Sequence, residues 1–195
     1  MFSLHKPEPA AIAAFLEAQR GAPFSHPHAG ATRDAGARTR PPAGYARDHH
    51  RQPLGRGAAA YARARAALAG WTMFSIGWVE LHPRTPALEA GTTVAVLVRA
   101  AGLWALNGCR IAYRLDEDGP VARFGFSYGT LDHAEAGEER FSVEWNRTDD
   151  TVSYDLLALS RPRHPLAWLG YPVTRRYQRR FARDTGLAMV GAVRG

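Results

Sequence analysis

The stretch RFGFSYGTL, residues 123–131, decides the fold class, because aromatic residues alternate in it with small ones. Three aromatic side chains fall on one side, and Gly125, Ser127 and Gly129 fall on the other. Such alternation is typical of a β-strand, in which successive side chains point to opposite faces of the sheet. Glycines opposite the aromatic side allow the sheet to bend or another segment to pack closely. We therefore expect a strand in a strongly bent sheet.

The same period of two recurs before and after this stretch. The strands that we expect cover Trp71–Leu81, Thr92–Arg99, Cys109–Leu115, Arg123–Leu131, Arg140–Trp145 and Thr151–Leu159. Short turns rich in Gly, Pro and Asp separate them, whereas a parallel pair would need a long crossover. The residues therefore predict an antiparallel sheet of about six or seven strands, with a weak signal for a polar edge strand at Gly44–Leu54. The inward face is left open, because a one-residue slip in register exchanges the two faces.

Helical spacing of apolar residues appears on both sides of the strand region. A short amphipathic helix is expected over Pro9–Arg20, a second helix over Gly55–Gly70 and a turn of helix over Pro165–Gly170. A long C-terminal helix is expected from Pro172 onward. Its apolar stripe, which would lie on the sheet, comprises Val173, Tyr177, Phe181, Ala188 and Ala192.

The order of these elements predicts an α+β domain of the helix-grip type. In this fold a bent antiparallel sheet holds a long C-terminal helix, here with a short helix before most of the sheet. The chain has 195 residues, which suits one domain. We expect an N-terminal helix and irregular extension at 1–44 and the helix-grip domain at 45–195. A bent sheet around a helix leaves an apolar space between them.

Several short stretches of the chain resemble a family of unknown function. They are LGRG (54–57), AALAGW (66–71), GLW (102–104), CRI (109–111), RFGFSYGTL (123–131), GEERF (137–141), SRP (160–162) and GYP (170–172), with Gln178 and Phe181. Together they resemble the domain of unknown function nineteen-ninety, which also forms the C-terminal part of YndJ-type proteins, over roughly residues 42–190. This family is similar to the START-like and birch-pollen-allergen-like superfamily. The resemblance implies a helix-grip fold and a tendency to bind apolar ligands, but it implies no established reaction.

The aromatic residues supply more bulk than a thin sheet needs. Two interpretations remain open, a solid core or a cavity whose walls are aromatic. On the second interpretation, the chain binds a small apolar or lipid-like ligand between the sheet and the C-terminal helix. The expected ligand contacts are Trp78, Trp104, Tyr128, Trp145 and Tyr154, with Arg161 as the polar anchor.

The densest polar cluster is His133, Glu135, Glu138 and Glu139, where two strands meet in a hairpin. It could ligate a metal or move a proton, or it could be a solvated acidic hairpin tip paired with arginines. The alternative function is an enzyme that acts on such a ligand with His133, Glu138 and Arg161 converging at the cavity mouth. The sequence has no phosphate-binding loop, dinucleotide turn, nucleophile elbow or zinc-type spacing. We therefore expect no cofactor and no metal, and the balance leans away from an enzyme.

Charge is segregated along a chain whose net charge is +7. Residues 116–155 carry eleven acidic and three basic residues, whereas residues 156–195 carry eight basic and one acidic. A third hypothesis is therefore an anionic-surface or nucleic-acid binder that uses the arginines of the C-terminal helix. These arginines are Arg175, Arg176, Arg179, Arg180 and Arg183. Pairing with the acidic middle of the chain is the competing interpretation, and the lack of accompanying stacking aromatics disfavours nucleic acid.

Other features bear on the compartment. No run of about 18 uncharged apolar residues is present, so we expect no membrane-spanning helix. The first residues carry Glu8 and Glu17 and lack the apolar centre of a secretory signal. The single cysteine, Cys109, cannot form an internal disulfide. These features predict a cytoplasmic protein, and they leave its oligomeric state open.

Overall fold

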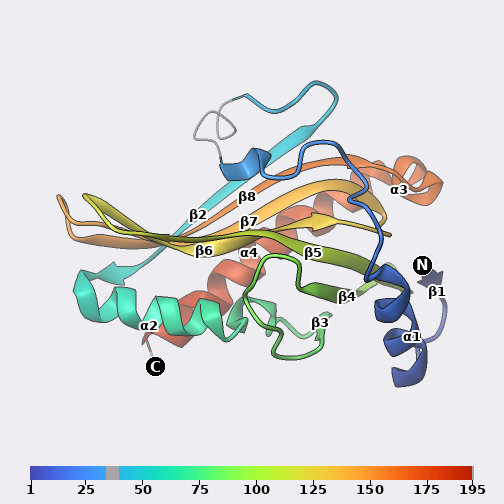
Figure 1. Ribbon diagram of the computed structural model, residues 1–195, viewed down its shortest axis with the longest axis horizontal. Coiled ribbons are helices and arrows are strands. Elements are labelled where there is room, and N and C mark those ends of the chain that lie inside the picture. Colours follow the sequence, from blue (N-terminus) through green and yellow to red (C-terminus); the bar gives the residue numbers. More distant parts are fainter. Residues whose placement is uncertain (34–39, 195) are drawn as a thin grey trace.

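The computed structural model describes residues 1–33 and 40–194, and its architecture is α+β with one antiparallel sheet (Figure 1). The strands are β1 (Phe2–Ser3), β2 (Ala46–Arg56), β3 (Val79–His82), β4 (Thr93–Ala100), β5 (Leu103–Glu117), β6 (Val121–Thr130), β7 (Glu135–Asn146) and β8 (Thr151–Pro162). Their order is β2-β8-β7-β6-β5-β4-β3, and β1 pairs with β5. The α+β class and the antiparallel curved sheet are confirmed.

The helices lie on both faces of this sheet. They are α1 (Pro9–Gln19), α2 (Gly57–Ala69), α3 (Pro165–Leu169) and α4 (Tyr171–Arg194), with single 3₁₀ turns at Ala31–Arg33 and Thr72–Phe74. Helices α2 and α4 cover one face, which we call the inner face (Figure 1). Helix α1 and the 3₁₀ turn at Ala31–Arg33 pack on the opposite, outer face. The long C-terminal helix held by a sheet is the helix-grip arrangement that was expected.

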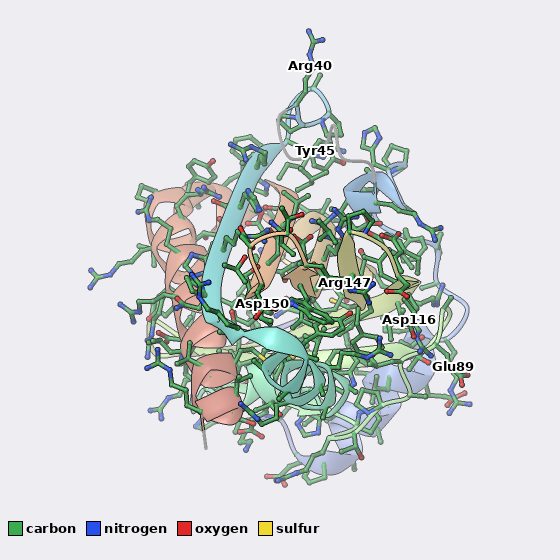
Figure 2. The ribbon with its side chains drawn as sticks, turned by 90° about the vertical axis from the view of Figure 1, so that its left-hand side faces the viewer. Arg40, Tyr45, Glu89, Asp116, Arg147 and Asp150 are labelled. Carbon is green, nitrogen blue, oxygen red and sulfur yellow. The ribbon has the colours of Figure 1, made fainter. Side chains whose placement is uncertain are left out.

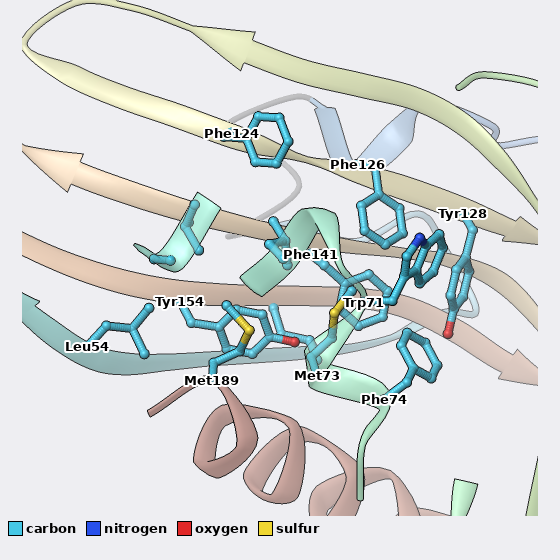
Figure 3. Packing of buried hydrophobic residues seen from close by; sticks show 14 of the residues in the cluster. Leu54, Trp71, Met73, Phe74, Phe124, Phe126, Tyr128, Phe141, Tyr154 and Met189 are labelled. Atoms are coloured by element: carbon cyan, nitrogen blue, oxygen red, sulfur yellow. The ribbon is translucent and has the colours of Figure 1, made fainter. Parts of the chain in front are cut away.

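The aromatic stripe of β6 points to the inner face and forms the centre of the core (Figure 3). The side chains of Phe126 and Phe141 are fully buried with their ring centroids 5.4 Å apart. The ring of Trp71 lies 4.4 Å from that of Phe126, between the sheet and α2. Burial of each such side chain contributes roughly 1.5–3 kcal/mol, so this cluster dominates the apolar stabilisation.

The expected strand at Trp71–Leu81 is wrong over most of its length. Only Val79–His82 is strand, and Thr72–Phe74 forms a 3₁₀ turn. Trp71 has a φ of 58° and donates a hydrogen bond from Nε1 to the Pro86 carbonyl at 3.0 Å. Its ring fills the core from a loop, because tertiary packing overrides the local preference of an aromatic residue for a strand.

The apolar stripe of α4 is shifted from the expected one in its second half. The buried residues are Ala182, Thr185, Gly186, Met189 and Val193, whereas Ala188 and Ala192 are half-buried. The helix approaches β2 closely at Gly186, where an added Cβ would lie 3.2 Å from His50 Nε2. Contact with this edge strand therefore rotates the buried face away from the most apolar set.

Strands β5 and β7 extend furthest beyond their expected bounds. β5 begins at Leu103 and β7 begins at Glu135, so residues 135–139 are strand rather than a hairpin tip. Glu135 and Glu138 are 8% and 3% exposed. The interpretation of this acidic stretch as a solvated tip is therefore wrong, because the turn lies at 131–134 and the carboxyl groups alternate between the two faces of β7.

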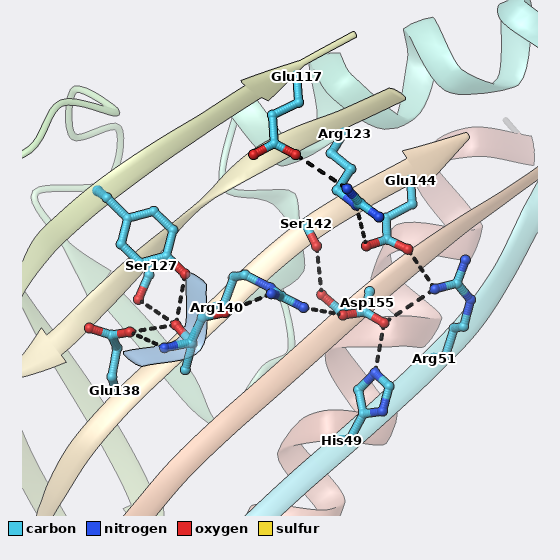
Figure 4. Close-up of polar contacts among 12 residues, drawn as sticks. His49, Arg51, Glu117, Arg123, Ser127, Glu138, Arg140, Ser142, Glu144 and Asp155 are labelled. Carbon is cyan, nitrogen blue, oxygen red and sulfur yellow. Dashed lines mark hydrogen bonds and ion pairs between the residues drawn. The ribbon is translucent and has the colours of Figure 1, made fainter. Parts of the chain in front are cut away.

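The outer face buries a network of ion pairs (Figure 4). Arg140, 4% exposed, donates to Asp155 at 2.8 Å. Glu144 accepts hydrogen bonds from Arg51 at 2.6 Å and from Arg123 at 3.2 Å. Each of these buried carboxylates thus has an arginine partner, which is what makes a buried charge tolerable.

The N-terminal segment 22–33 lies across the outer face of β6 and β7. The carboxylate of Glu138 accepts hydrogen bonds from the backbone N–H of Gly30 and of Thr32, and from the Thr32 hydroxyl. At Gly129 an added Cβ would lie 2.7 Å from the Phe24 ring, so a glycine opposite the aromatic stripe does permit close packing. The division into an extension at 1–44 and a domain at 45–195 stays a prediction.

Candidate ligand-binding cavity

A cavity of about 610 Å³ lies between the inner face of the sheet and the N-terminal half of α4. At roughly 30 Å³ for each molecule of liquid water, this is room for about twenty waters. It falls within the usual size of ligand-binding cavities, roughly 300–1,000 Å³. The sheet and helix are therefore not packed solid against each other at this end of the molecule.

Most of the cavity wall is apolar because it is made by the inner-face positions of the strands. Strands β4, β5 and β8 and helix α4 contribute aliphatic and aromatic side chains, with Trp78 from the loop before β3. These include Val96, Val98, Leu103, Leu156, Val173 and Phe181. Tyr177 closes one side by accepting a hydrogen bond at its hydroxyl from the backbone N–H of Ala101, at 2.9 Å. Leu169 and Val173 are largely exposed where α3 meets α4 and mark the opening.

The polar part of the wall centres on Glu139 of β7 and Tyr128 of β6. The Tyr128 hydroxyl donates a hydrogen bond to Glu139 Oε2 at 2.8 Å. Burial raises the pKa of Glu139 to about 7, against the opposing effect of the Tyr128 hydrogen bond. Burial, and then the nearby Glu139 charge, raise the pKa of Tyr128 well above its usual range. The Glu139 side chain is half-buried, and the burial of its carboxyl group disfavours the charged form.

Glu135 is the second carboxyl group of the wall, four residues before Glu139 on the same strand face. It is 8% exposed, and its Oε1 has no hydrogen-bond partner. Burial raises its pKa to about 7, although hydrogen bonds from Ser160 and Gln178 and the charge of Arg175 act in the opposite direction. The Arg175 guanidinium is itself engaged, since it binds both oxygens of Asp48.

His133 lines the cavity at the turn between β6 and β7. Its Nδ1 accepts a hydrogen bond from the backbone N–H of Glu135 at 2.9 Å. Burial lowers the pKa of this imidazole to about 4, so it is neutral near pH 7. Among the described residues, no lysine or arginine lines the cavity.

The structure brings only two of the expected ligand contacts to this cavity, Trp78 and Tyr128. Tyr154 is fully buried in the core near Met189 (Figure 3). Trp104 packs with the outer-face cluster of α1, beneath Lys6 and Arg99.

Trp145 also lies away from the cavity, near the end of the sheet that carries the β5–β6 and β7–β8 turns. Its Nε1 donates to Asp150 at 2.9 Å, and Arg147 lies over its ring; both partners are labelled in Figure 2. Since β7 is twelve residues long, this turn lies at the opposite end of the strand from the cavity. Trp145 instead packs against Tyr61 of α2.

Arg161 does not reach the cavity, because it faces outward from β8. Its guanidinium lies over the ring of Tyr45 at 5.1 Å. Glu138 likewise directs its carboxylate to the outer face, to Thr32 and Gly30. His133, Glu138 and Arg161 therefore do not converge on one point, and the geometry required by the enzyme alternative is absent in this set.

Several lining residues escaped the sequence reasoning. Ser160 stands beside Arg161 but points to the inner face, where its hydroxyl accepts from Gln178 Nε2 at 3.2 Å. Asp48 comes from the weakly predicted edge strand β2. Only the register of β2, β7 and β8 shows which of these neighbours face inward. The one local indication in the sequence is the spacing of Arg175 and Gln178, which stand one helical turn apart and so share one side of the helix.

Three of the arginines of α4 form ion pairs. Arg175 pairs with Asp48, and both Arg180 and Arg183 pair with Asp184. In residues 1–33 and 40–194, no group of three or more His, Cys, Asp or Glu is arranged to hold a metal ion. None of the helices in that part of the chain is long and apolar enough to cross a membrane.

Comparison with known proteins finds relatives along nearly the whole chain. The model of the family described as Domain of unknown function (DUF1990) matches residues 25–188. A UPF0548 protein of Dictyostelium discoideum is 35% identical, covering 99% of this chain and 96% of its own. A UPF0548 protein of Deinococcus radiodurans is 37% identical, covering 98% of both chains.

Two solved structures are also similar, at low sequence identity. The crystal structure of Ara h 8.0201 matches with a TM-score of 0.48 and 12% identity, covering 77% of this chain and 98% of that one. The crystal structure of human STARD10 matches with a TM-score of 0.48 and 12% identity, covering 95% of this chain and 81% of that one.

Proposed function

The chain belongs to the family described as Domain of unknown function (DUF1990), and within that family we propose that it binds a small, largely apolar molecule between the sheet and α4. The observation that carries the proposal is the cavity of about 610 Å³ with an apolar wall and a few polar groups. Water gains little from an apolar enclosure of this size, so an apolar molecule that displaces it is stabilised. Trp78 and Tyr128 are the aromatic contacts that we retain, together with Phe181 and Tyr177 of α4.

A cavity wall on which the described residues form no convergent set of acid, base and nucleophile favours binding over catalysis. The Tyr128 hydroxyl and the Glu139 carboxylate are hydrogen-bonded to each other. Of the expected catalytic trio, Arg161 does not line the cavity and Glu138 directs its carboxylate to the outer face. A binding protein needs only the shape, the apolar surface and a group that orients the ligand.

Titration with Nile red, a neutral dye that fluoresces in apolar surroundings, tests the proposal. We expect saturable binding of one dye molecule. Ala158 of β8 lines the cavity and is paired with Glu139 of β7, so the Ala158→Trp variant places an indole in the cavity. We expect this variant to bind the dye about tenfold or more weakly, because it removes volume that the dye needs.

The matched control is Ala62→Trp, on the exposed side of α2, which should leave dye binding unchanged. Circular dichroism checks that both variants are folded. Failure of the unmodified protein to bind Nile red, or equal binding by the Ala158→Trp variant, would rule out the cavity as a ligand site. Native mass spectrometry of freshly purified protein then identifies any molecule that it retains.

A further inference from the structure

The charged groups of the cavity wall are of one sign. Asp48, Glu135 and Glu139 line it, His133 is neutral near pH 7, and no lysine or arginine of the described chain lines it. The nearest guanidinium acting on Glu135 is that of Arg175, which is bound through two nitrogens to Asp48. Asp48 is therefore paired with Arg175, whereas Glu135 and Glu139 have no ion pair among the described residues.

Glu139 has an especially one-sided environment. Tyr128 of β6 is its hydrogen-bond partner, and the other groups that interact with its charge are Cys109 of β5, Tyr154 of β8 and Asp48 of β2. All of these are acids or neutral groups. From α4, the residues that line the same space are apolar or amide side chains such as Phe181, Ala182 and Gln178. Within residues 1–33 and 40–194, no lysine or arginine forms an ion pair with Glu139 or lines the cavity.

Glu135 gives a second, independent indication that a partner is missing. Its side chain lines the cavity, is 8% exposed and leaves Oε1 without a hydrogen bond. Buried polar atoms are almost always hydrogen-bonded, and an unpaired one costs free energy. A donor supplied by a bound molecule would satisfy this oxygen.

We propose that the ligand of this cavity is an amphiphilic amine, whose protonated nitrogen binds the Glu139 carboxylate and whose carbon body fills the apolar remainder. The inference rests on the proposed function and deepens it by naming the ligand class. An ammonium group donates charge-assisted hydrogen bonds, which are roughly twice as strong as neutral ones. A fatty-acid carboxylate would instead bring a like charge beside Glu139 and Glu135.

The two carboxyl groups have different roles in this proposal. Four residues of strand separate them, which is about 13 Å at roughly 3.3 Å per residue. Glu139, for which the described residues supply no ion-pair partner, holds the ammonium. Glu135 lies nearer the β6–β7 turn, adds negative potential to the cavity, and offers its free oxygen to a second donor on the ligand.

A series of decylamine, decanol and decanoate tests the ligand class, because each has ten carbon atoms and the three carry a positive, a neutral and a negative head group. Each is used at about pH 7.5 to displace Nile red from the full chain; the amine is then protonated and the acid ionised. We expect decylamine to displace the dye at about tenfold lower concentration than decanol, from the greater strength of a charged hydrogen bond. Decanoate should be the weakest of the three.

The Glu139→Gln variant should remove the preference for decylamine over decanol, because the amide keeps the shape and the Tyr128 partner but not the charge. Glu135→Gln should reduce the preference by a smaller factor. Glu117→Gln, which removes a carboxylate that is 46% exposed, is the charge control and should keep the full preference. Retention of Nile red binding by each variant shows that the cavity is intact.

Proton release gives a readout that a change in shape cannot imitate. Burial raises the pKa of Glu139 to about 7, so part of the population is protonated near that pH. Because ammonium binding favours the carboxylate, decylamine should release about half a proton there, and decanol none. Calorimetry in two buffers of different ionisation enthalpy measures this difference.

The outcomes separate this inference from the proposed function. If Nile red does not bind, the proposed function fails and the inference fails with it. If Nile red binds but decanol or decanoate displaces it as well as decylamine does, or if Glu139→Gln keeps the full preference for the amine, the amine assignment alone is overturned.

Discussion

Replacing Glu139 by Gln tests whether this carboxyl group is desolvated in the folded protein. Burial raises the pKa of Glu139 to about 7 from its usual value near 4.5, and Tyr128 donates to it at 2.8 Å. Between these two pH values the folded chain holds a proton that the unfolded chain releases. The carboxyl group therefore contributes stability below about pH 4.5, and this contribution is lost as the pH rises through about 7.

The size of the effect follows from the difference between the folded and unfolded pKa. One pKa unit corresponds to about 1.36 kcal/mol, so the rise from 4.5 to about 7 corresponds to about 3 kcal/mol. Glutamine does not titrate in this range. The free energy of unfolding of the unmodified protein, minus that of the Glu139→Gln variant, should therefore fall by about 3 kcal/mol between pH 4.5 and pH 8.

Taking this difference removes the other titrations from the comparison. Burial raises the pKa of Glu135 to about 7 and lowers those of His26 and His133 to about 4. The two histidines make stability rise with pH between about 4 and 6.5, so the profile of either protein alone is a mixture. Because both proteins share these groups, their contributions cancel in the difference.

Urea unfolding followed by tryptophan fluorescence, at half-unit steps from pH 4.5 to 8, measures the two free energies. The slope of free energy against urea concentration should be the same for both proteins if their native states are equally compact. A difference that stays constant within about 0.5 kcal/mol over this range would mean that water solvates Glu139. The desolvation argument for the cavity would then be refuted.

Two further substitutions test the sheet itself. Arg140→Met leaves Asp155 buried without its closest arginine and should lower the free energy of unfolding in urea by about 3–5 kcal/mol. The control Arg147→Met breaks a pair with an exposed carboxylate and should lower it by less than about 1 kcal/mol. Equal decreases for the two variants would contradict the role of burial. Gly125→Ala places a Cβ 2.2 Å from the Phe141 carbonyl and should lower the thermal midpoint by several degrees, whereas Gly21→Ala, with open space around its Cβ, should not.

The strand core was predictable because its signal is local. Alternation over residues 123–131 fixes β6 without knowledge of its neighbours, and the turn residues set the antiparallel order. The loop at Trp71 was not predictable in this way. Trp71 has a positive φ and packs its indole against Phe126, and a sequence pattern does not record such a long-range contact.

The candidate site was half predictable, for a reason visible in β7. Alternation places Glu135, Gly137 and Glu139 on the inner face, where a packed core would require apolar residues. The apolar alternation that predicts a strand therefore stops where the cavity begins, so the sequence pattern indicates a turn at residues where β7 starts. The same face rule separates Ser160, which lines the cavity, from Arg161, which does not. Only the pairing of β7 with β8 resolves that choice.

The carboxyl groups on the two faces of β7 differ in whether they have arginine partners. On the outer face, Arg140 meets Asp155, and Glu144 meets two arginines, so burial there is compensated within the chain. On the inner face, no ion pair within the described part of the chain joins Glu135 or Glu139 to an arginine. The outer face of β7 thus shows that arginines can pair with carboxyl groups of this strand, and the inner face lacks such pairs. A carboxyl group without a cationic partner beside the cavity must either take up a proton or bind a cation supplied by a ligand. Because a bound cation displaces the proton, the amount of proton released on binding measures how far the ligand supplies that charge.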